Sequence, residues 1–173
     1  MKELILGGVR SGKSRYAEQR AHASGLPVIY VATATADDEE MRARIRAHQA
    51  RRPASWTSIE SPHLLAQTLR HHAAPGCCIL VDCLTLWLTN LLCADDNTLF
   101  SREYQALIDL LPTLPGHIIL VSNETNMGII PMGELSRRFC DEAGRLHQEL
   151  ALHCDRVVLT VAGLPLAVKE ATT

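Results

Sequence analysis

The stretch GGVRSGKS, residues 7–14, follows a short apolar run and leads into a stretch with helical character. It fits the pattern Gly-x-x-x-x-Gly-Lys-Ser, whose glycines let successive backbone N–H groups converge on phosphate oxygens. In this pattern Lys13 reaches the β- and γ-phosphates and the Ser14 hydroxyl coordinates Mg²⁺. A strand before the loop and a helix beginning at the lysine complete the expected context. The segment therefore predicts a nucleotide-binding protein, against the alternative of a glycine turn with an incidental lysine.

Outward from this loop, short apolar runs alternate with helical stretches. We expect strands over residues 3–8, 27–35, 77–83, 117–124 and 156–163. We expect helices over 11–25, 37–52, 61–76, 84–92, 99–111 and 134–153, with Ser61 capping the third and Pro62 in its first turn. Strands that are apolar throughout and separated by helices predict an α/β fold with a mainly parallel sheet, flanked by helices on both faces. Ligands bind at the carboxyl ends of such strands, where the chain places its glycine-rich loop, Asp82 and Asn123–Glu124.

Composition limits the classes of function. The 173 residues predict a single domain over 1–173. The net charge of −2 gives no general electrostatic reason to bind nucleic acid or a membrane surface. The six cysteines show no metal-binding spacing, and no run resembles a signal peptide or a membrane-spanning helix. We therefore expect a cytoplasmic protein with reduced thiols.

The segment RIRAHQARRP, residues 44–53, places His48 among four arginines. On a helix, His48 would lie between an apolar stripe and a cationic stripe containing Arg44 and Arg52. Positive neighbours favour the neutral, nucleophilic form of an imidazole, and arginines bind polyphosphate through forked contacts. A phosphate-handling histidine needs both, whereas a solvated basic face with a boundary histidine is the plain alternative.

Asp82 ends an apolar strand, the position from which an acidic residue holds Mg²⁺ directly or through water. A helix cap or a turn residue is the alternative for such an aspartate. Six further histidines have no partners at metal-ligand spacing, and we interpret them as structural, surface or helix-end residues: His22, His63, His71, His72, His117 and His153.

Seven segments together resemble one family. They are GGVRSGKS, YVATAT, DDEEMRARIRAHQARRP, W...ES, LVDCLTLWLTNLL, VSNETNMGIIP and RRFCDEAGRLHQELA, which run in this order from about residue 3 to 169. The chain is similar in them to the bifunctional adenosylcobinamide kinase and adenosylcobinamide-phosphate guanylyltransferases of cobalamin assembly. The resemblance implies a P-loop NTPase-like, RecA-like fold.

The resemblance also implies two reactions. A kinase step would phosphorylate adenosylcobinamide with ATP or GTP, and a transferase step would move GMP from GTP onto that phosphate through a covalent GMP-histidine, here His48. It implies His48 and Lys13 as catalytic residues, Ser14 and Asp82 as Mg²⁺ ligands, and a homo-oligomer, by analogy a trimer. It implies the following nucleotide-binding residues: Gly7, Gly8, Val9, Arg10, Ser11, Gly12, Lys13, Ser14, Thr33, Ala34, Thr35, Gln49, Ala50, Arg51, Arg52, Glu60 and Asp82.

The chain departs from the family pattern at a few positions. It has Thr125-Asn126 where Val-Gly is usual, Cys140 where arginine is common and His147 where asparagine is usual. These departures bear on contacts with the corrinoid rather than on the two chemistries. Two other functions stay open at this point: a plain small-molecule kinase without covalent nucleotide, and a nucleotide-dependent switch, for which residues 93–97 and 127–133 are the candidate loops.

Overall fold

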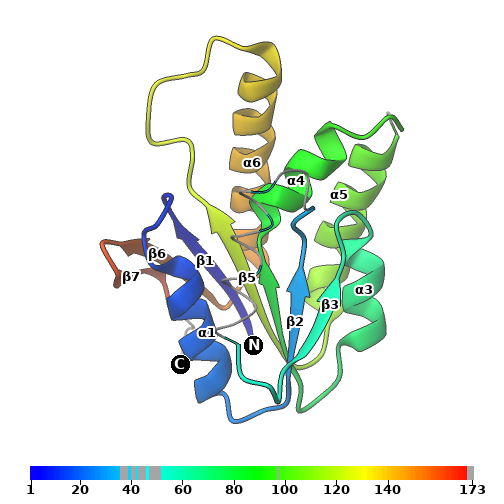
Figure 1. The fold of residues 1–173 in the computed structure, drawn as a ribbon, viewed down its shortest axis with the longest axis vertical. Coiled ribbons are helices and arrows are strands. Elements are labelled where there is room, and N and C mark those ends of the chain that lie inside the picture. The colour runs from blue at the N-terminus through cyan, green and yellow to red at the C-terminus, as the bar shows by residue number, and fades with distance from the viewer. Residues whose placement is uncertain (36–38, 40–41, 43–45, 47–51, 97, 171–173) are drawn as a thin grey trace.

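A seven-stranded sheet forms the centre of the protein (Figure 1). The computed structural model describes residues 1–35, 39, 42, 46, 52–96 and 98–170. The strand order is β3-β2-β4-β5-β1-β6-β7, and only the β6–β7 pair is antiparallel. The strands are β1 (Lys2–Gly7), β2 (Val28–Ala32), β3 (Thr57–Glu60), β4 (Cys78–Asp82), β5 (His117–Asn123), β6 (Arg156–Val161) and β7 (Leu164–Lys169). The expected α/β fold with a mainly parallel sheet is confirmed.

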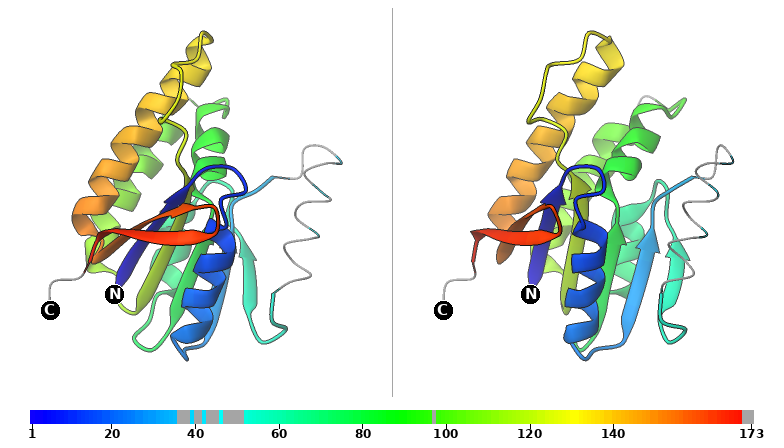
Figure 2. Two further views of the ribbon diagram at one scale, coloured as in Figure 1. Left: turned by 90° about the vertical axis from the view of Figure 1, so that its left-hand side faces the viewer. Right: turned by 60° about the vertical axis from the view of Figure 1, so that its left-hand side comes forward.

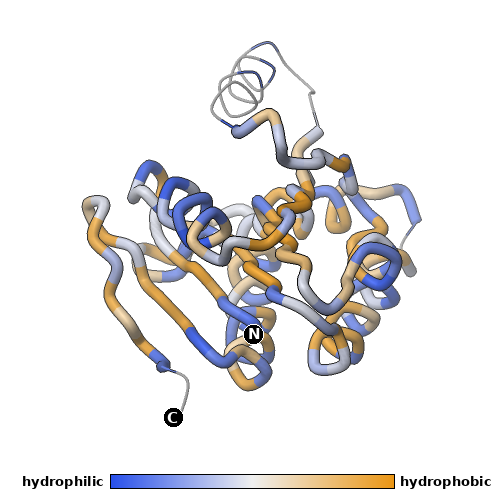
Figure 3. Tube along the Cα trace, turned by 90° about the horizontal axis from the view of Figure 1, so that it is seen from below, coloured by the Kyte–Doolittle hydropathy of each residue, from blue (hydrophilic) through white to orange (hydrophobic). Residues whose placement is uncertain are grey.

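Helices cover both faces of the sheet, as expected, but unequally. The helices are α1 (Lys13–Ala23), α3 (Leu65–His72), α4 (Leu84–Leu92), α5 (Leu99–Leu110) and α6 (Glu134–His153), and a 3₁₀ turn, η1 (Leu111–Thr113), follows α5. Helix α1 lies on one face of the sheet and the other helices lie on the opposite face (Figure 2). One apolar cluster joins the strands to α3, α4, α5 and α6, and a second joins the other face to α1. Apolar residues concentrate along the central strands (Figure 3) because both of their faces are covered.

Most predicted elements are confirmed, and α6 and α4 have the predicted bounds. The predicted cap at Ser61 is wrong. Helix α3 begins at Leu65 without a side-chain cap, and the Ser61 hydroxyl instead contacts the Thr68 hydroxyl at 2.8 Å. The predicted helix over 37–52 lies mostly outside the described residues. Within this range, Glu39, Arg42 and Arg46 are described and are helical.

Two strands were not predicted, and both lie at the edges of the sheet. Strand β3 is largely exposed, and every residue of β7 is exposed. Neither has the continuous apolar run by which a central strand is recognised, since an edge strand is covered less. Strand β7 pairs with β6 through a turn at Ala162 and Gly163, whose φ angles are both positive.

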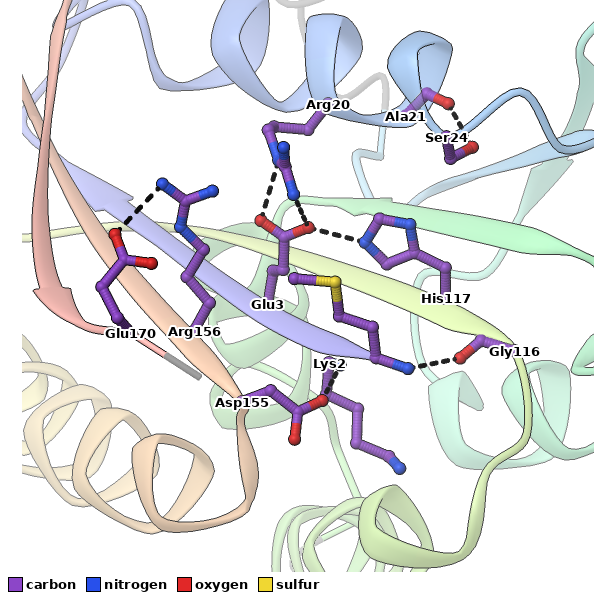
Figure 4. A network of polar contacts seen from close by, with 11 residues as sticks. Lys2, Glu3, Arg20, Ala21, Ser24, Gly116, His117, Asp155, Arg156 and Glu170 are labelled. Atoms are coloured by element: carbon purple, nitrogen blue, oxygen red, sulfur yellow. Dashed lines mark hydrogen bonds and ion pairs between the residues drawn. The ribbon is translucent and has the colours of Figure 1, made fainter. Parts of the chain in front are cut away.

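A buried acid holds together the end of the sheet opposite the carboxyl ends of its strands (Figure 4). Glu3 on β1 is fully buried and accepts two hydrogen bonds from Arg20 of α1, at 3.0 and 2.8 Å. Its Oε1 also lies 2.6 Å from His117 Nε2, at the start of β5. Burial by itself raises the pKa of Glu3, but the bonds from His117 and Arg20 outweigh it and lower this pKa from 4.5 to about 2. His117 is therefore structural, as expected.

We expect Glu3 to make the stability depend on pH in acid. Because its pKa is lower in the folded chain than in the unfolded chain, its contribution is complete above pH 4.5 and is lost as the pH falls towards 2. This contribution is on the order of 3 kcal/mol at neutral pH. Urea unfolding of wild type and Glu3→Gln should show a difference in unfolding free energy that shrinks as the pH falls from about 7 to about 3. Asp155→Asn removes an exposed carboxylate at the same edge as a control, and a difference independent of pH would contradict the prediction.

All six cysteines are free thiols. Within the described part of the chain, no helix is long and apolar enough to cross a membrane. His, Cys, Asp and Glu side chains of the same residues form no cluster of three or more suited to a metal ion.

Candidate functional site

The predicted phosphate loop lies between β1 and α1, at the carboxyl edge of the sheet. Ser11 N donates to Gly8 O at 3.2 Å, which closes the turn, and Gly12 has φ +97° immediately before α1. The turn between β6 and β7 supports the loop from the side, because Gly163 N donates to Ser11 O at 2.8 Å. A Cβ on Gly12 would lie 2.9 Å from Gly163 Cα, so only glycine fits this contact. The loop therefore has the shape that the sequence pattern predicts.

Lys13 is the first residue of α1, and only 9% of its surface is exposed. Its Nζ donates to Gly8 O at 3.2 Å, so the ammonium folds back across the loop. Burial lowers the pKa of Lys13, whereas the neighbouring Cys83 and Asp82 act in the opposite direction. The backbone N–H groups of the loop would bind a polyphosphate at this position, and the Lys13 cation would offset its negative charge.

Residues 33–35 follow β2 at the same edge, beside the end of β4. The fully buried Thr33 joins the two strand ends: its hydroxyl donates to Cys83 O at 2.6 Å and accepts from Cys83 N at 2.9 Å. Asn90 of α4 donates to Thr33 O at 2.8 Å. Thr33 is thus held by backbone contacts, and the loop that continues through Ala34 and Thr35 starts from a rigid point.

Asp82 is part of a contact chain that reaches Arg52. Tyr30 donates from its hydroxyl to Asp82 Oδ2 at 3.0 Å. The Arg52 guanidinium lies over the Tyr30 ring, 3.4 Å from its centroid, and Arg52 also lies 3.4 Å from the Ser58 hydroxyl. Burial first, and then the charge of Asp82, raise the pKa of Tyr30, so the phenol stays protonated and keeps donating. Two predicted site residues are thereby brought together through a tyrosine that the sequence did not single out.

The fit of a Mg²⁺ ion depends on Ser14 and Asp82. Both supply hard oxygen ligands of the kind that Mg²⁺ prefers. Tyr30 donates to only one carboxylate oxygen of Asp82, Oδ2, and the charge of Asp82 acts on the buried Lys13 of the loop. The side chains present therefore suit the ion.

The remaining predicted site residues are Glu60 and the segment from His48 to Arg51. Glu60 ends β3, two strands away from β4 and its Asp82, and is exposed. His48, Gln49, Ala50 and Arg51 lie outside the described residues, so their predicted roles stay predictions.

Glu124 directly follows strand β5 and is not among the predicted site residues. Its backbone N donates to Gly7 O at 3.0 Å, so it lies directly beside the phosphate loop. Its side chain is 14% exposed and approaches His147 of α6. The signal that could have identified it is its position after an apolar strand, the same signal that identified Asp82.

The loop from residue 124 to 133 projects beyond the carboxyl edge of the sheet and leads into α6 (Figures 1 and 2). Between this loop and α6 lies an open hollow of 630 Å³, lined on one side by Thr125, Asn126, Ile129 and Ile130 and on the other by polar residues of α6. Four apolar side chains of the loop are more than three-quarters exposed: Met127, Ile129, Ile130 and Met132. An apolar rim with polar groups behind it suits a large amphipathic ligand.

Comparisons with known proteins agree with this geometry. A family model described as cobinamide kinase / cobinamide phosphate guanyltransferase matches residues 3–168. The bifunctional adenosylcobalamin biosynthesis protein CobP of Pseudomonas aeruginosa is 60% identical over 169 residues and covers 98% of each chain. The bifunctional adenosylcobalamin biosynthesis protein CobU of Salmonella typhimurium is 40% identical over 183 residues, covering 98% of this chain and all of the relative.

A solved structure from Pyrococcus horikoshii OT3 is similar in fold alone, with a TM-score of 0.52 and 10% identity over 99% of this chain and 87% of that one. The names of the sequence relatives confirm the expected class, bifunctional enzymes of cobalamin biosynthesis. The chain belongs to the cobinamide kinase / cobinamide phosphate guanyltransferase family.

Proposed function

We propose that this chain phosphorylates the aminopropanol hydroxyl of adenosylcobinamide with ATP or GTP. It then transfers GMP from GTP to that phosphate, which yields adenosylcobinamide-GDP and pyrophosphate. The observation that carries the proposal is the formed phosphate loop with buried Lys13 beside Asp82, in a chain matched by the family over residues 3–168.

In the kinase step, backbone N–H groups of residues 7–14 and the Lys13 ammonium would bind the β- and γ-phosphates. Ser14 and Asp82 would hold Mg²⁺, which neutralises phosphate charge when it is bound. Thr33, Ala34 and Thr35 would line the nucleotide where β2 ends. Since little covalent work falls to the protein in phosphoryl transfer, positioning and charge stabilisation by these groups carry the step.

In the transferase step, His48 would attack the α-phosphorus of GTP. The new N–P bond forms as the bond to pyrophosphate breaks, and a phosphate oxygen of the corrinoid then displaces the histidine. Gln49, Ala50, Arg51, Arg52 and Glu60 would contact the nucleotide. The contact of Arg52 with Tyr30, which bonds to Asp82, supports this role because it links the segment after His48 to the proposed metal ligand. We further propose that the protein is cytoplasmic and forms a homo-oligomer, by family analogy a trimer. The exposed apolar residues of β7 are consistent with burial in a subunit interface.

The test uses Mg²⁺ and GTP labelled at the α-phosphorus. We expect acid-labile, alkali-stable label on the denatured wild-type chain, because a phosphoramidate to histidine has this stability. His48→Ala should reduce the label to background and leave phosphorylation of adenosylcobinamide intact. His22→Ala, which removes an exposed histidine of α1, is the matched control and should keep the label. An unlabelled wild-type chain that still phosphorylates the corrinoid would instead make the plain kinase the better description.

A further inference from the structure

A chain of buried and partly buried polar contacts crosses from α4 through β5 to α6 at the carboxyl edge of the sheet. Asn123 N donates to Thr85 Oγ1 at 2.7 Å, and Thr85 Oγ1 lies 3.3 Å from Ser122 Oγ. Ser122 Oγ lies 2.7 Å from His147 Nε2. At the other side of the same ring, His147 Nδ1 lies 3.8 Å from Glu124 Oε2. The contacts therefore run continuously towards one carboxylate beside the phosphate loop.

The donors and acceptors of this chain allow one continuous direction, from Asn123 towards Glu124. A backbone N–H can only donate, so the Thr85 oxygen accepts from Asn123, and its own hydrogen is available to Ser122. The carboxylate 3.8 Å from Nδ1 favours the tautomer with its hydrogen on Nδ1, and in that tautomer Ser122 donates to Nε2 of His147. Burial lowers the pKa of His147, although the charge of Glu124 opposes this, so the ring is neutral and carries one hydrogen. With Nε2 accepting, that hydrogen sits on Nδ1 and faces Glu124.

His147 is 7% exposed, and its Nδ1 has no hydrogen-bond partner among the described residues. A buried donor without a partner costs free energy, and 3.8 Å is longer than a hydrogen bond. A small rotation of the Glu124 side chain would close this gap. The Nδ1–H group of His147 would then donate to the Glu124 carboxylate and hold it in one orientation.

Glu124 lies between the phosphate loop and the hollow beside α6. Its backbone N bonds to Gly7 O, and its Oε1 accepts from Asn126 N at 2.8 Å. Thr125 and Asn126, the next two residues, begin the lining of the hollow. A substrate that enters through the hollow would therefore meet this carboxylate at the phosphate loop.

We propose that Glu124 is a catalytic residue that accepts the proton of the acceptor hydroxyl in the kinase step, that His147 positions it, and that the acceptor enters through the hollow between the 124–133 loop and α6. This inference rests on the proposed kinase function. The hydroxyl oxygen bonds to the γ-phosphorus as the bond from that phosphorus to the β,γ-bridging oxygen breaks, and the nucleoside diphosphate leaves with the electron pair. The hydroxyl proton passes to the carboxylate of Glu124 and from there to water.

The two reactions differ in their need for such a base. The acceptor in the kinase step is an alcohol, which must lose a proton, whereas the acceptor in GMP transfer is a phosphate that is already anionic. Loss of Glu124 should therefore act selectively on the kinase step. A purely structural role in the 124–133 loop would instead affect both reactions alike.

The first test compares wild type with Glu124→Gln, which keeps an oxygen for Asn126 N but cannot accept the proton. Kinase turnover is measured with ATP and adenosylcobinamide, and GMP transfer is measured separately with adenosylcobinamide phosphate supplied. We expect kinase kcat to fall roughly 10²- to 10³-fold, with the ratio of kinase to transferase turnover falling by a similar factor. Unchanged kinase kcat, or an equal fall in both reactions, would overturn the inference. A wild-type chain without kinase activity would instead remove the proposed function itself.

The second test separates the two sides of the His147 ring. In His147→Asn the amide nitrogen can take the place of Nδ1 and face Glu124, whereas His147→Gln reaches the place of Nε2 and keeps only the Ser122 contact. We expect the glutamine variant to lose roughly 10-fold or more in kinase kcat, with KM for ATP little changed, because the base is misplaced. The asparagine variant should retain most of the turnover. If kcat instead follows the melting temperatures of the two variants, His147 is only structural and the positioning role is wrong.

Discussion

Replacing Lys13 with methionine is expected to lower kinase kcat/KM by roughly 10³-fold, because the variant loses the cation that stabilises charge on the transferred phosphate. Methionine keeps the apolar stem of the buried side chain and removes only the ammonium, which in the free protein donates to Gly8 O. The free energy of unfolding should change little, since the lost hydrogen bond is offset by the desolvation cost of the buried charge. Steady-state kinetics with ATP and thermal unfolding together separate the two effects.

The matched control for this prediction is Arg15→Ala, which removes an exposed positive charge from the same helix. It should change kcat/KM far less than the Lys13 variant does. Turnover of Lys13→Met within about tenfold of wild type would contradict the role of the loop lysine.

Gly12→Ala should damage both the loop and the stability of the chain. Gly12 has φ +97°, and a Cβ there would lie 2.9 Å from Gly163 Cα in the turn between β6 and β7. Backbone strain and this collision should cost about 2 to 3 kcal/mol, or roughly 5 to 10 °C in the unfolding midpoint. Because the collision pushes the loop away from the turn that supports it, the affinity for ATP should fall at least tenfold. Such a fall corresponds to a loss of about 1.4 kcal/mol in binding free energy.

Gly8→Ala is the comparison, because no atom lies within 4 Å of a Cβ built at Gly8. Calorimetric unfolding and nucleotide titration should show a clearly smaller effect for this variant. If Gly12→Ala lowers the midpoint but leaves ATP affinity intact, the loop is not the nucleotide site.

The central elements could be predicted because their own side chains specify them. Strands β4 and β5 are continuous apolar runs, since both of their faces are covered, and α6 carries the helical period over its whole length. The phosphate loop was equally predictable, because backbone geometry there demands glycine and the chemistry demands lysine.

The missed features depend on neighbours rather than on local residues. Edge strands β3 and β7 are exposed and exist through pairing with β2 and β6, which no local pattern records. The Ser61 cap failed for a related reason: its backbone N bonds to Ala32 O and its hydroxyl meets Thr68, so tertiary contacts outweigh the local preference. The family resemblance, not the physics of the residues, supplied the corrinoid substrate.

By itself the sequence determined the α/β class, the order of the central elements and the phosphate loop, because hydrophobic periodicity and loop chemistry act over a few neighbouring residues. Only the tertiary structure decided that Tyr30 joins Arg52 to Asp82, that Gly163 supports Gly12, and that His147 faces Glu124. Each of these contacts joins residues far apart in the chain. Their distances depend on how the strands pair and how the helices pack, which no local stretch of sequence encodes.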